Sequence, residues 1–195
     1  MPGAARGPTL GVVQFEQALT DAVTLREARV ADAAERAAAY ARNRDHLAPW
    51  DPARPASFFE PAGQHGLLTA RVAAADTGEG LPLHLVERVD GVDRVVGGIS
   101  LNHIVRGPVQ SASVGYWVDR ERTGRGLARS ALAVVADLAT TRLRLHRLEA
   151  SALPHNAASR RVLESSGFAL IGLAPSYLRI AGRWQDHVLY QRVLG

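Results

Sequence analysis

The chain has 195 residues, of which 47% are hydrophobic and 22% charged, a balance typical of a globular protein with a sizeable core. Cysteine is absent, which excludes disulfides, thiolate catalysis and cysteine-ligated metal sites. The formal net charge is +4 and all 23 basic residues are arginines, but no basic stretch is interleaved with aromatics, so nucleic acid is not favoured as the main target.

The first residues differ in character from the rest of the chain. Residues 1–19 begin with "MPGAARGPTLGVV", which is small and loop-like, so we expect a loose N-terminal arm followed by one domain over 20–195. The arm lacks the basic and apolar regions of a leader peptide. No run of about eighteen apolar residues is present. We therefore expect a cytoplasmic protein without a membrane segment.

The first half of the domain predicts a strand followed by helices. "AVTLREARV" over 22–30 alternates as a strand does, and 32–47 follows as a helix with Asp32 and Glu35 spaced as a capping box. "APWDP" ends that helix, and a further helix is expected around 61–75, closed by "DTGEG".

The middle of the chain predicts three strands and a helix. Strands are expected over 81–89, 93–105 and 111–118, with "DG" and "RGP" as turn sequences between them. Short turns between successive strands predict an antiparallel meander. Apolar residues then return at helical spacing, which predicts an amphipathic helix over 126–141.

A strand over 147–153 comes after that helix, and a strand–helix–strand unit normally makes its two strands parallel. Residues 156–167 form a second helix, with Asn156 at its N-cap and Gly167 at its C-terminal stop. The chain closes with two strands, "FALIGLAPSYLRI" and "QDHVLYQRVL". Together these elements predict an α+β domain in which helices lie on the faces of a mixed sheet.

"TGRGLA" (123–128) lies where a strand gives way to a helix. Backbone N–H groups at a helix start lack intrahelical partners and attract a phosphate, and glycine lets that phosphate approach. Arg122, Arg125 and Arg129 surround this point. No Gly-Lys-Ser/Thr follows and the third glycine of a dinucleotide fingerprint is missing, which excludes both of those phosphate loops. The pattern alone also fits a tight turn that needs glycine only for its dihedral angles.

Two stretches, "GYWVDRERTGRGLARSAL" (115–132) and "LPHNAASRRVLESSGF" (153–168), resemble in order and spacing the GNAT superfamily of acyl-CoA-dependent N-acetyltransferases. The family's pyrophosphate motif is Gln/Arg-x-x-Gly-x-Gly/Ala. Gly126 and Ala128 match it, whereas Thr123 stands where Gln or Arg is usual. The resemblance implies a GNAT fold, in which a central mixed, mostly antiparallel and splayed sheet of about six or seven strands is flanked by about four helices. It also implies acetyl-CoA as co-substrate and no metal.

Within the superfamily the chain is most similar to the ribosomal-protein-alanine N-acetyltransferases (Rim type). Three further stretches carry this similarity: "RNRDHLAPWDP" (42–52), "LNHIVRG" (101–107) and "YLRIAGRWQDHVL" (177–189). The implied activity is direct acetyl transfer to a primary amine, and we expect the α-amine of a protein N-terminus, with a ribosomal protein and the ribosome as partners. Relatives with the same pattern acetylate other amines.

The resemblance also assigns a set of residues to the cofactor. In the family, pantetheine lies between two separating strands and bonds to backbone, and a backbone N–H near Val118 polarises the thioester carbonyl. The expected cofactor-binding residues are Trp117, Val118, Arg122, Thr123, Gly124, Arg125, Gly126, Leu127, Ala128, Arg129, Asn156 and Ser159. Asn156 also has a purely structural interpretation as a helix cap.

Two residues are candidates for catalysis. Ser159 matches a serine that relatives are proposed to use as a general acid toward the leaving thiolate, although a thiol leaves without much help. Glu149 is the candidate general base, with Asp186 or an ordered water as alternatives, and its alternation with apolar neighbours fits a solvated position on the sheet equally well. An α-amine has a pKa of about 7.7 to 8.0 and so tolerates a weak base.

Trp50, Asn102 and Tyr116 match positions near the acceptor cleft of the family. A small-molecule N-acetyltransferase acting on an antibiotic or polyamine stays open as an alternative. So does a protein of another class, a ribosome or RNA-binding assembly factor that keeps the fold without turnover. The sequence does not decide between a monomer and a dimer.

Overall fold

The structure, a computed structural model, describes residues 15–195. The first fourteen residues of the expected arm lie outside this range. Glu16–Ala18, also placed in that arm, forms strand β1, which pairs antiparallel with β2 (Val23–Glu27). This short strand extends the sheet by one strand beyond those expected.

Within residues 15–195 the strands form one eight-stranded sheet in the order β1-β2-β3-β4-β5-β6-β8-β7. The other strands are β3 (Leu81–Val89), β4 (Val92–Val105), β5 (Ser111–Val118), β6 (Arg147–Ala152), β7 (Ala169–Ile180) and β8 (Arg183–Val193). All neighbours are antiparallel except β5 and β6, which are parallel. The structure therefore confirms the α+β class, the antiparallel meander and the parallel crossover.

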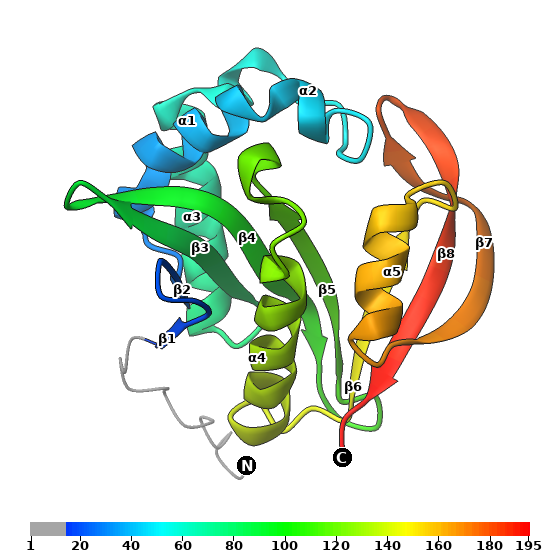
Figure 1. The fold of residues 1–195 in the computed structure, drawn as a ribbon. Helices are drawn as coiled ribbons and strands as arrows, with labels where there is room; N and C mark the ends of the chain where they lie inside the picture. The colour runs from blue at the N-terminus through cyan, green and yellow to red at the C-terminus, as the bar shows by residue number, and fades with distance from the viewer. Residues whose placement is uncertain (1–14) are drawn as a thin grey trace, which may run out of the picture.

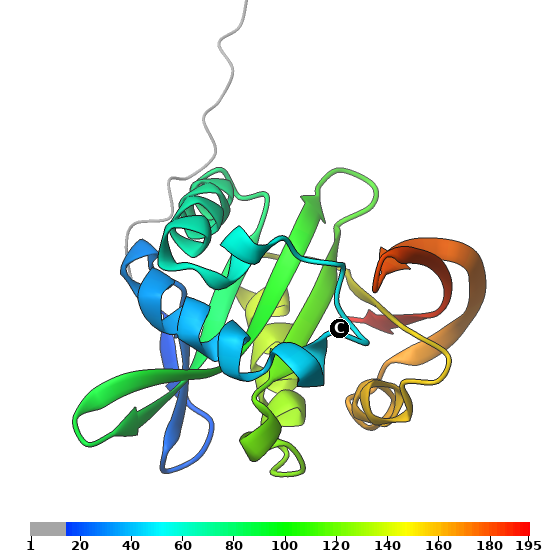
Figure 2. The same cartoon turned by 90° about the horizontal axis from the view of Figure 1, so that it is seen from above.

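Helices cover both faces of the sheet (Figures 1 and 2). They are α1 (Ala33–Arg42), α2 (Arg44–Leu47), α3 (Pro61–Asp76), α4 (Leu127–Thr141) and α5 (Ala157–Ser165). The apolar sides of α4 and α5 pack with the sheet into the main core, whereas α1 and α3 pack against each other and against β3 and β4 on the opposite face. Both faces of the central strands are thus buried, as their long apolar runs require.

The helix expected over 32–47 is interrupted at Asn43, where φ is −104° and ψ is 10°. The side-chain amide of Asn43 donates to Ala39 O and to Asp119 Oδ2, each at 2.9 Å, and its Oδ1 accepts from Arg120 N at 2.8 Å. These bonds tie the end of α1 to the segment that follows β5. Tertiary hydrogen bonds here outweigh the local helical pattern.

The expected capping box at Asp32 and Glu35 is wrong. Asp32 instead accepts two bonds from Arg26, at 2.8 and 2.9 Å, and one from Nδ1–H of His84 at 2.9 Å, while Glu35 accepts from the backbone N–H of Val95. Burial alone would raise the pKa of Asp32, but the hydrogen bonds from His84 and Arg26 hold it well below its usual range. This buried ionic group joins β2, β3 and the start of α1.

The central strands β5 and β6 stay paired for only three residues. Their register runs from Ser111 opposite Arg147 to Ser113 opposite Glu149, after which β5 continues to Val118 and β6 to Ala152 on diverging paths (Figure 1). The sheet is therefore split at its centre, and the split is the starting point of the site.

We expect Asp32→Asn to lower the free energy of unfolding by about 3 kcal/mol or more at pH 7, because the buried Arg26 loses its main counter-charge and keeps only the more distant Asp93, at 3.7 Å. Folding lowers the pKa of Asp32, so its contribution is full above a pH of about 4, the unfolded value, and is lost as the pH falls below it. In urea unfolding, the gap between wild type and variant narrows from pH 7 toward pH 3. The exposed Asp137→Asn is the control, expected within about 0.5 kcal/mol of wild type; equally small losses in both variants would contradict the assignment.

Candidate active site

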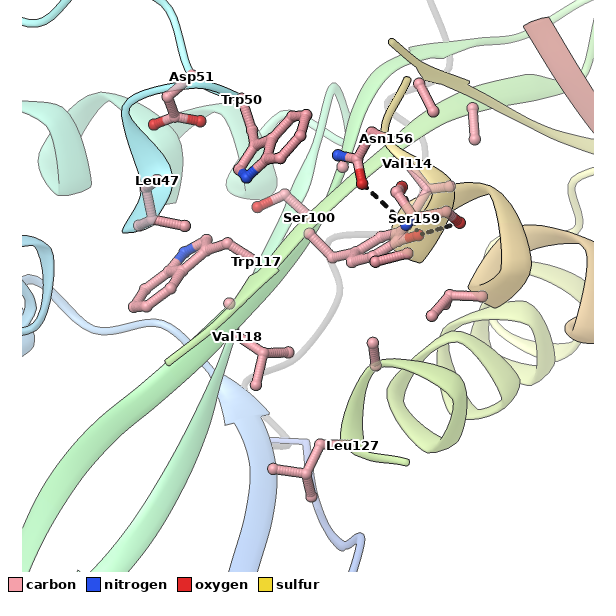
Figure 3. Close-up of a pocket in the computed structure, with 18 of the residues that line it drawn as sticks. Leu47, Trp50, Asp51, Ser100, Val114, Trp117, Val118, Leu127, Asn156 and Ser159 are labelled. Atoms are coloured by element: carbon pink, nitrogen blue, oxygen red, sulfur yellow. Dashed lines mark hydrogen bonds between the residues drawn. The ribbon is translucent and has the colours of Figure 1, made fainter. Parts of the chain in front are cut away.

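A cavity of about 540 Å³ occupies the split between β5 and β6. Its walls come from both strands, from the first turns of α4 and α5, and from α1, α3 and the loop after α2. Figure 3 shows Trp50 and Trp117 on one side of this space and Asn156 and Ser159 on the other. Segments distant in sequence thus meet where the sheet opens.

The free edge of β5 can bond an extended ligand. Asp119 N donates to Val96 O of β4 at 2.8 Å, and backbone groups alternate sides along a strand. The N–H and C=O groups of Val114, Tyr116 and Val118 therefore point away from β4, into the opening. A ligand with alternating amide groups can join this edge as an added strand.

The first turn of α4 forms the second part of the site. Gly126 is its N-cap, with a φ of 76° and no side-chain cap, and Gly124 has a φ of 75°. Both glycines hold left-handed conformations that other residues adopt only with strain. The N–H groups of Leu127, Ala128 and Arg129 have no carbonyl of their own helix to bond. This helix start is therefore built to receive an anion.

The arginines around that turn differ in their readiness to bind an anion. Arg122 donates to Glu87 at 2.6 Å and to Glu121 at 3.0 Å, so its charge is already compensated. These bonds from Arg122 are also the main reason that the pKa of Glu87 is lowered. Arg129 lines the cavity, whereas Arg125 is exposed and does not. The backbone and Arg129 thus make the anion site.

Thr123, which stands where the family motif has Gln or Arg, has a structural role in the turn. Its hydroxyl donates to Arg120 O at 2.9 Å. The two glycines that follow keep their positive φ angles in its presence. The departure at Thr123 therefore leaves the backbone cradle intact.

Tyr116 and Ser159 bridge the opening. Tyr116 Oη lies 2.9 Å from Ser159 Oγ, and Ser159 N donates to Asn156 Oδ1 at 3.0 Å (Figure 3). Asn156 is thus an N-cap that also lines the cavity. Burial raises the pKa of Tyr116 to about 12. Its hydroxyl is therefore neutral at pH 7 and remains able to donate a proton.

Trp117 faces the opposite side of β5, toward α1 and α3. Its ring lies against Tyr40, with centroids 4.7 Å apart, and a Cβ at Gly98 would come within 2.9 Å of its Nε1. The ring of Trp50 lies 5.6 Å from the ring of His155, centroid to centroid, and Trp50 also lines the cavity. The cavity extends from the start of α4 to the space between these two tryptophans. We call the first part its cofactor end and the second, where Trp50 was expected to meet the substrate, its acceptor end.

Most of the residues predicted for the site line this cavity. They are Trp50, Asn102, Tyr116, Trp117, Val118, Arg122, Thr123, Gly124, Gly126, Leu127, Ala128, Arg129, Asn156 and Ser159. Trp117 was expected at the cofactor and Tyr116 at the substrate. Alternation along β5 turns Tyr116 toward Ser159 of α5 and Trp117 toward Tyr40 of α1.

Glu149, the predicted general base, does not line the cavity. It lies where β5 and β6 are still paired, opposite Ser113, and its carboxylate contacts Arg147 at 2.8 Å. Asp186, the alternative, accepts from Ser176 N at 2.8 Å and is exposed. The structure brings neither carboxylate into the cavity.

The prediction missed four charged residues at the acceptor end, namely Asp51, Arg36, Arg54 and Arg71. Asp51 lies beside Trp50 in the loop after α2, and burial raises its pKa despite the nearby Arg54. No periodicity marks a loop residue. Its place directly after Trp50 in "APWDP" was the one available signal.

An open strand edge beside a helix start that can receive an anion fits an enzyme that binds an extended, phosphate-bearing co-substrate such as coenzyme A. The profile described as "Acetyltransferase (GNAT) domain" matches residues 22–169. The chain belongs to this family and is an N-acetyltransferase that uses acetyl-CoA. The expected superfamily, fold and co-substrate are confirmed.

Among curated relatives, "Probable N-acetyltransferase YjcK" of Bacillus subtilis (strain 168) is 33% identical over 165 residues, 85% of this chain and 90% of the relative. The [ribosomal protein uS5]-alanine N-acetyltransferase of Escherichia coli (strain K12) is 31% identical over 170 residues, 87% of each chain.

Two solved structures have a similar fold. The ribosomal-protein-S5-alanine acetyltransferase of Vibrio fischeri has a TM-score of 0.86 and 34% identity, covering 93% of this chain and 97% of its own. RimJ of Mycobacterium smegmatis in complex with CoA-disulfide has a TM-score of 0.81 and 34% identity, covering 88% and 81%.

Two further features bear on the class of protein. Over residues 15–195, no cluster of three or more histidine or acidic side chains offers a metal site. In the same part of the chain, no helix combines the length and apolar character needed to cross a membrane.

We expect Ala128→Glu to raise the Kd for CoA at least tenfold, about 1.4 kcal/mol, because its carboxylate lies in the anion cradle. A carboxylate at a helix start also stabilises the helix, so the unfolding temperature without ligand does not fall. Titration calorimetry measures the first quantity and thermal unfolding the second. Ala133→Glu, an exposed position on the same helix outside the cavity, adds the same charge and is expected to bind CoA as wild type does; equal losses in both would contradict this cradle.

Proposed function

We propose that the protein transfers acetyl from acetyl-CoA directly to the α-amine of a protein N-terminus, a ribosomal protein being the expected class. The observation that carries this proposal is the extent of the cavity. It runs from its cofactor end at α4, past the open edge of β5, to its acceptor end between Trp50 and Trp117. Relatives named as ribosomal-protein-alanine N-acetyltransferases, at 31% to 34% identity, support the acceptor class.

The residues present suit acetyl-CoA in two places. The helix start at Gly126 takes the pyrophosphate, and the free edge of β5 takes the amide groups of the pantetheine arm. The backbone N–H of Val118, which points into the opening, would stabilise an oxyanion that forms on the thioester carbonyl. Acetyl-CoA supplies the activated acetyl group.

The reaction exchanges one bond for another. The neutral amine nitrogen bonds to the carbonyl carbon, the carbon–sulfur bond breaks, the nitrogen loses a proton and the sulfur gains one. Ser159 donates to the departing sulfur. Tyr116 Oη lies 2.9 Å from Ser159 Oγ, and burial raises its pKa, so this hydrogen-bonded hydroxyl stays protonated. No covalent acetyl-enzyme is needed, since holding both substrates in place is itself a large part of catalysis.

Asp51 takes the place of Glu149 as the proposed base. It is the acidic residue among the cavity-lining side chains, and burial raises its pKa toward that of an amine. An α-amine is already partly neutral at pH 7, because its pKa is about 7.7 to 8.0, whereas a lysine at about 10.4 is almost wholly charged. A single modest base therefore favours an N-terminus over a lysine.

Acetyl transfer to a panel of amines tests the acceptor. The panel contains peptides with free N-termini, N-terminally blocked peptides with one lysine, and small amines such as a polyamine and an aminoglycoside, each scored by mass. We expect the free N-termini to react at least tenfold faster than the blocked peptides. Faster reaction of a small amine would replace this proposal with the small-molecule alternative, and no transfer to any amine would leave the assembly-factor interpretation.

Loss of the bridging hydroxyls tests the proton path. We expect Ser159→Ala and Tyr116→Phe each to lower kcat about tenfold, toward the low end for general acids because a thiol with a pKa near 8.5 leaves readily. The KM for acetyl-CoA is expected to change less than kcat. Tyr177→Phe, which removes an exposed hydroxyl on β7, is the matched control, and an unchanged kcat in both site variants would exclude this path.

A further inference from the structure

Three guanidinium groups gather at the acceptor end of the cavity. Arg36 comes from α1, Arg54 from the loop after α2 and Arg71 from α3, and all three line the chamber beyond Trp117. Among the described side chains that line the cavity, Asp51 is the single acidic one. The acceptor end therefore carries an excess of positive charge.

Arg36 is the most telling of the three. Only 3% of its surface is exposed, and the partners that the structure gives it are neutral, namely the Gln64 side-chain oxygen and the face of Tyr40 at 4.9 Å. Burial lowers its pKa. A buried charge whose direct contacts are neutral is costly, so a ligand group with negative charge would be favoured beside it.

Arg54 and Arg71 are less committed. Arg54 lies 3.6 Å from Asp51 and over the ring of Phe58 at 4.5 Å. Arg71 is exposed and donates to Ser100 Oγ at 3.4 Å, a long bond. Both guanidinium groups keep free donors, and a guanidinium binds a carboxylate well through its paired donors.

Asp32 does not neutralise the three arginines. Its carboxylate already accepts hydrogen bonds from Arg26 and from His84, a residue that lines the cavity. His84 itself is buried, and burial lowers its pKa, so it adds no charge of its own at pH 7. Asp51 is thus the single acidic side chain of the cavity lining that can balance the charge of the three arginines.

The position of Arg71 limits which anion can reach it. Ser100 lies on β4 opposite Gly115 of β5, and neighbouring strands are about 4.8 Å apart. The guanidinium of Arg71 is therefore roughly 7 to 10 Å from the free edge of β5 at Gly115. Val118, the proposed level of reaction, lies about 10 Å further along that strand, so the reacting amine is roughly 12 to 14 Å away. An extended peptide advances about 3.5 Å per residue. A side-chain carboxylate one or two residues after the N-terminal residue spans that distance, whereas the α-carboxylate of a free amino acid is too close to its own amine.

We infer that Arg36, Arg54 and Arg71 form an anion subsite that holds the side-chain carboxylate of an aspartate or glutamate at position two or three of the acceptor. The inference rests on the proposed transfer to a protein N-terminus and names its substrate class: acidic N-terminal segments. Such a contact positions the α-amine at the thioester and excludes basic N-termini by repulsion.

Matched peptides test this subsite. Peptides that begin with alanine and carry glutamate at position two or three are compared with the same peptides carrying glutamine, using wild-type protein and acetyl-CoA. We expect kcat/KM to be at least tenfold higher for the glutamate peptides, and this preference to shrink as salt is added. Free glutamate and free alanine form a further arm and are expected to react more slowly than either peptide.

Substitutions of the arginines test whether these residues cause the preference for glutamate peptides. Arg71→Gln, at an exposed position that can change without disturbing the core, is expected to reduce the glutamate preference to about threefold or less, and Arg54→Gln to act in the same direction. Arg161→Gln, exposed on α5 and outside the cavity, removes the same charge and is expected to keep the full preference. Unfolding temperatures confirm that each variant is folded.

The outcomes separate the two proposals. Equal rates for glutamate and glutamine peptides in wild type, or a full preference in both Arg71→Gln and Arg54→Gln, would overturn the subsite and leave N-terminal transfer standing. Preferred acetylation of free glutamate would overturn the peptide as its occupant. Failure of every peptide to react would overturn the proposed function itself.

Discussion

The separation of β5 and β6 after three paired residues is the constraint on which the site depends. Unpaired backbone groups in the middle of a sheet are costly unless something bonds them. Here the polar edge of β5 opens between two helix starts, so its unpaired backbone groups are available to an extended ligand. The first turns of α4 and α5 meet at this edge because each helix directly follows one of the two separating strands.

Local pattern located most of the elements, with β1 and the break at Asn43 as exceptions, but it did not orient the side chains. The bounds of β3 and β5 follow from alternation, and α4 follows from its apolar spacing. Alternation shows that Tyr116 and Trp117 lie on opposite faces of β5, but it does not tell which helices each face meets. Whether a residue of β6 reaches the cavity likewise depends on where the pairing of β6 with β5 ends. Glu149 is still paired with β5 and therefore does not line the cavity.

The remaining differences have tertiary causes. Asn43 leaves the helix because Asp119, far along the chain, offers it a hydrogen bond. Arg36, Arg54 and Arg71 come from three separate elements, and nothing in the spacing of these arginines distinguishes them from the many others in the chain. The positive charge at the proposed acceptor end can therefore be recognised only from the fold. The glycine turn at the proposed cofactor end is a local motif that can be recognised from the sequence.

The loop after α2 is held at two points. Ala181 N, in the turn between β7 and β8, donates to Asp51 O at 2.9 Å, and the ring of Trp50 rests against that of His155 before α5. A displacement of the β7–β8 turn therefore pulls on the same backbone that carries Trp50. This rim of the cavity thus joins three segments that are distant in sequence, namely the loop after α2, the β7–β8 turn and the residues before α5.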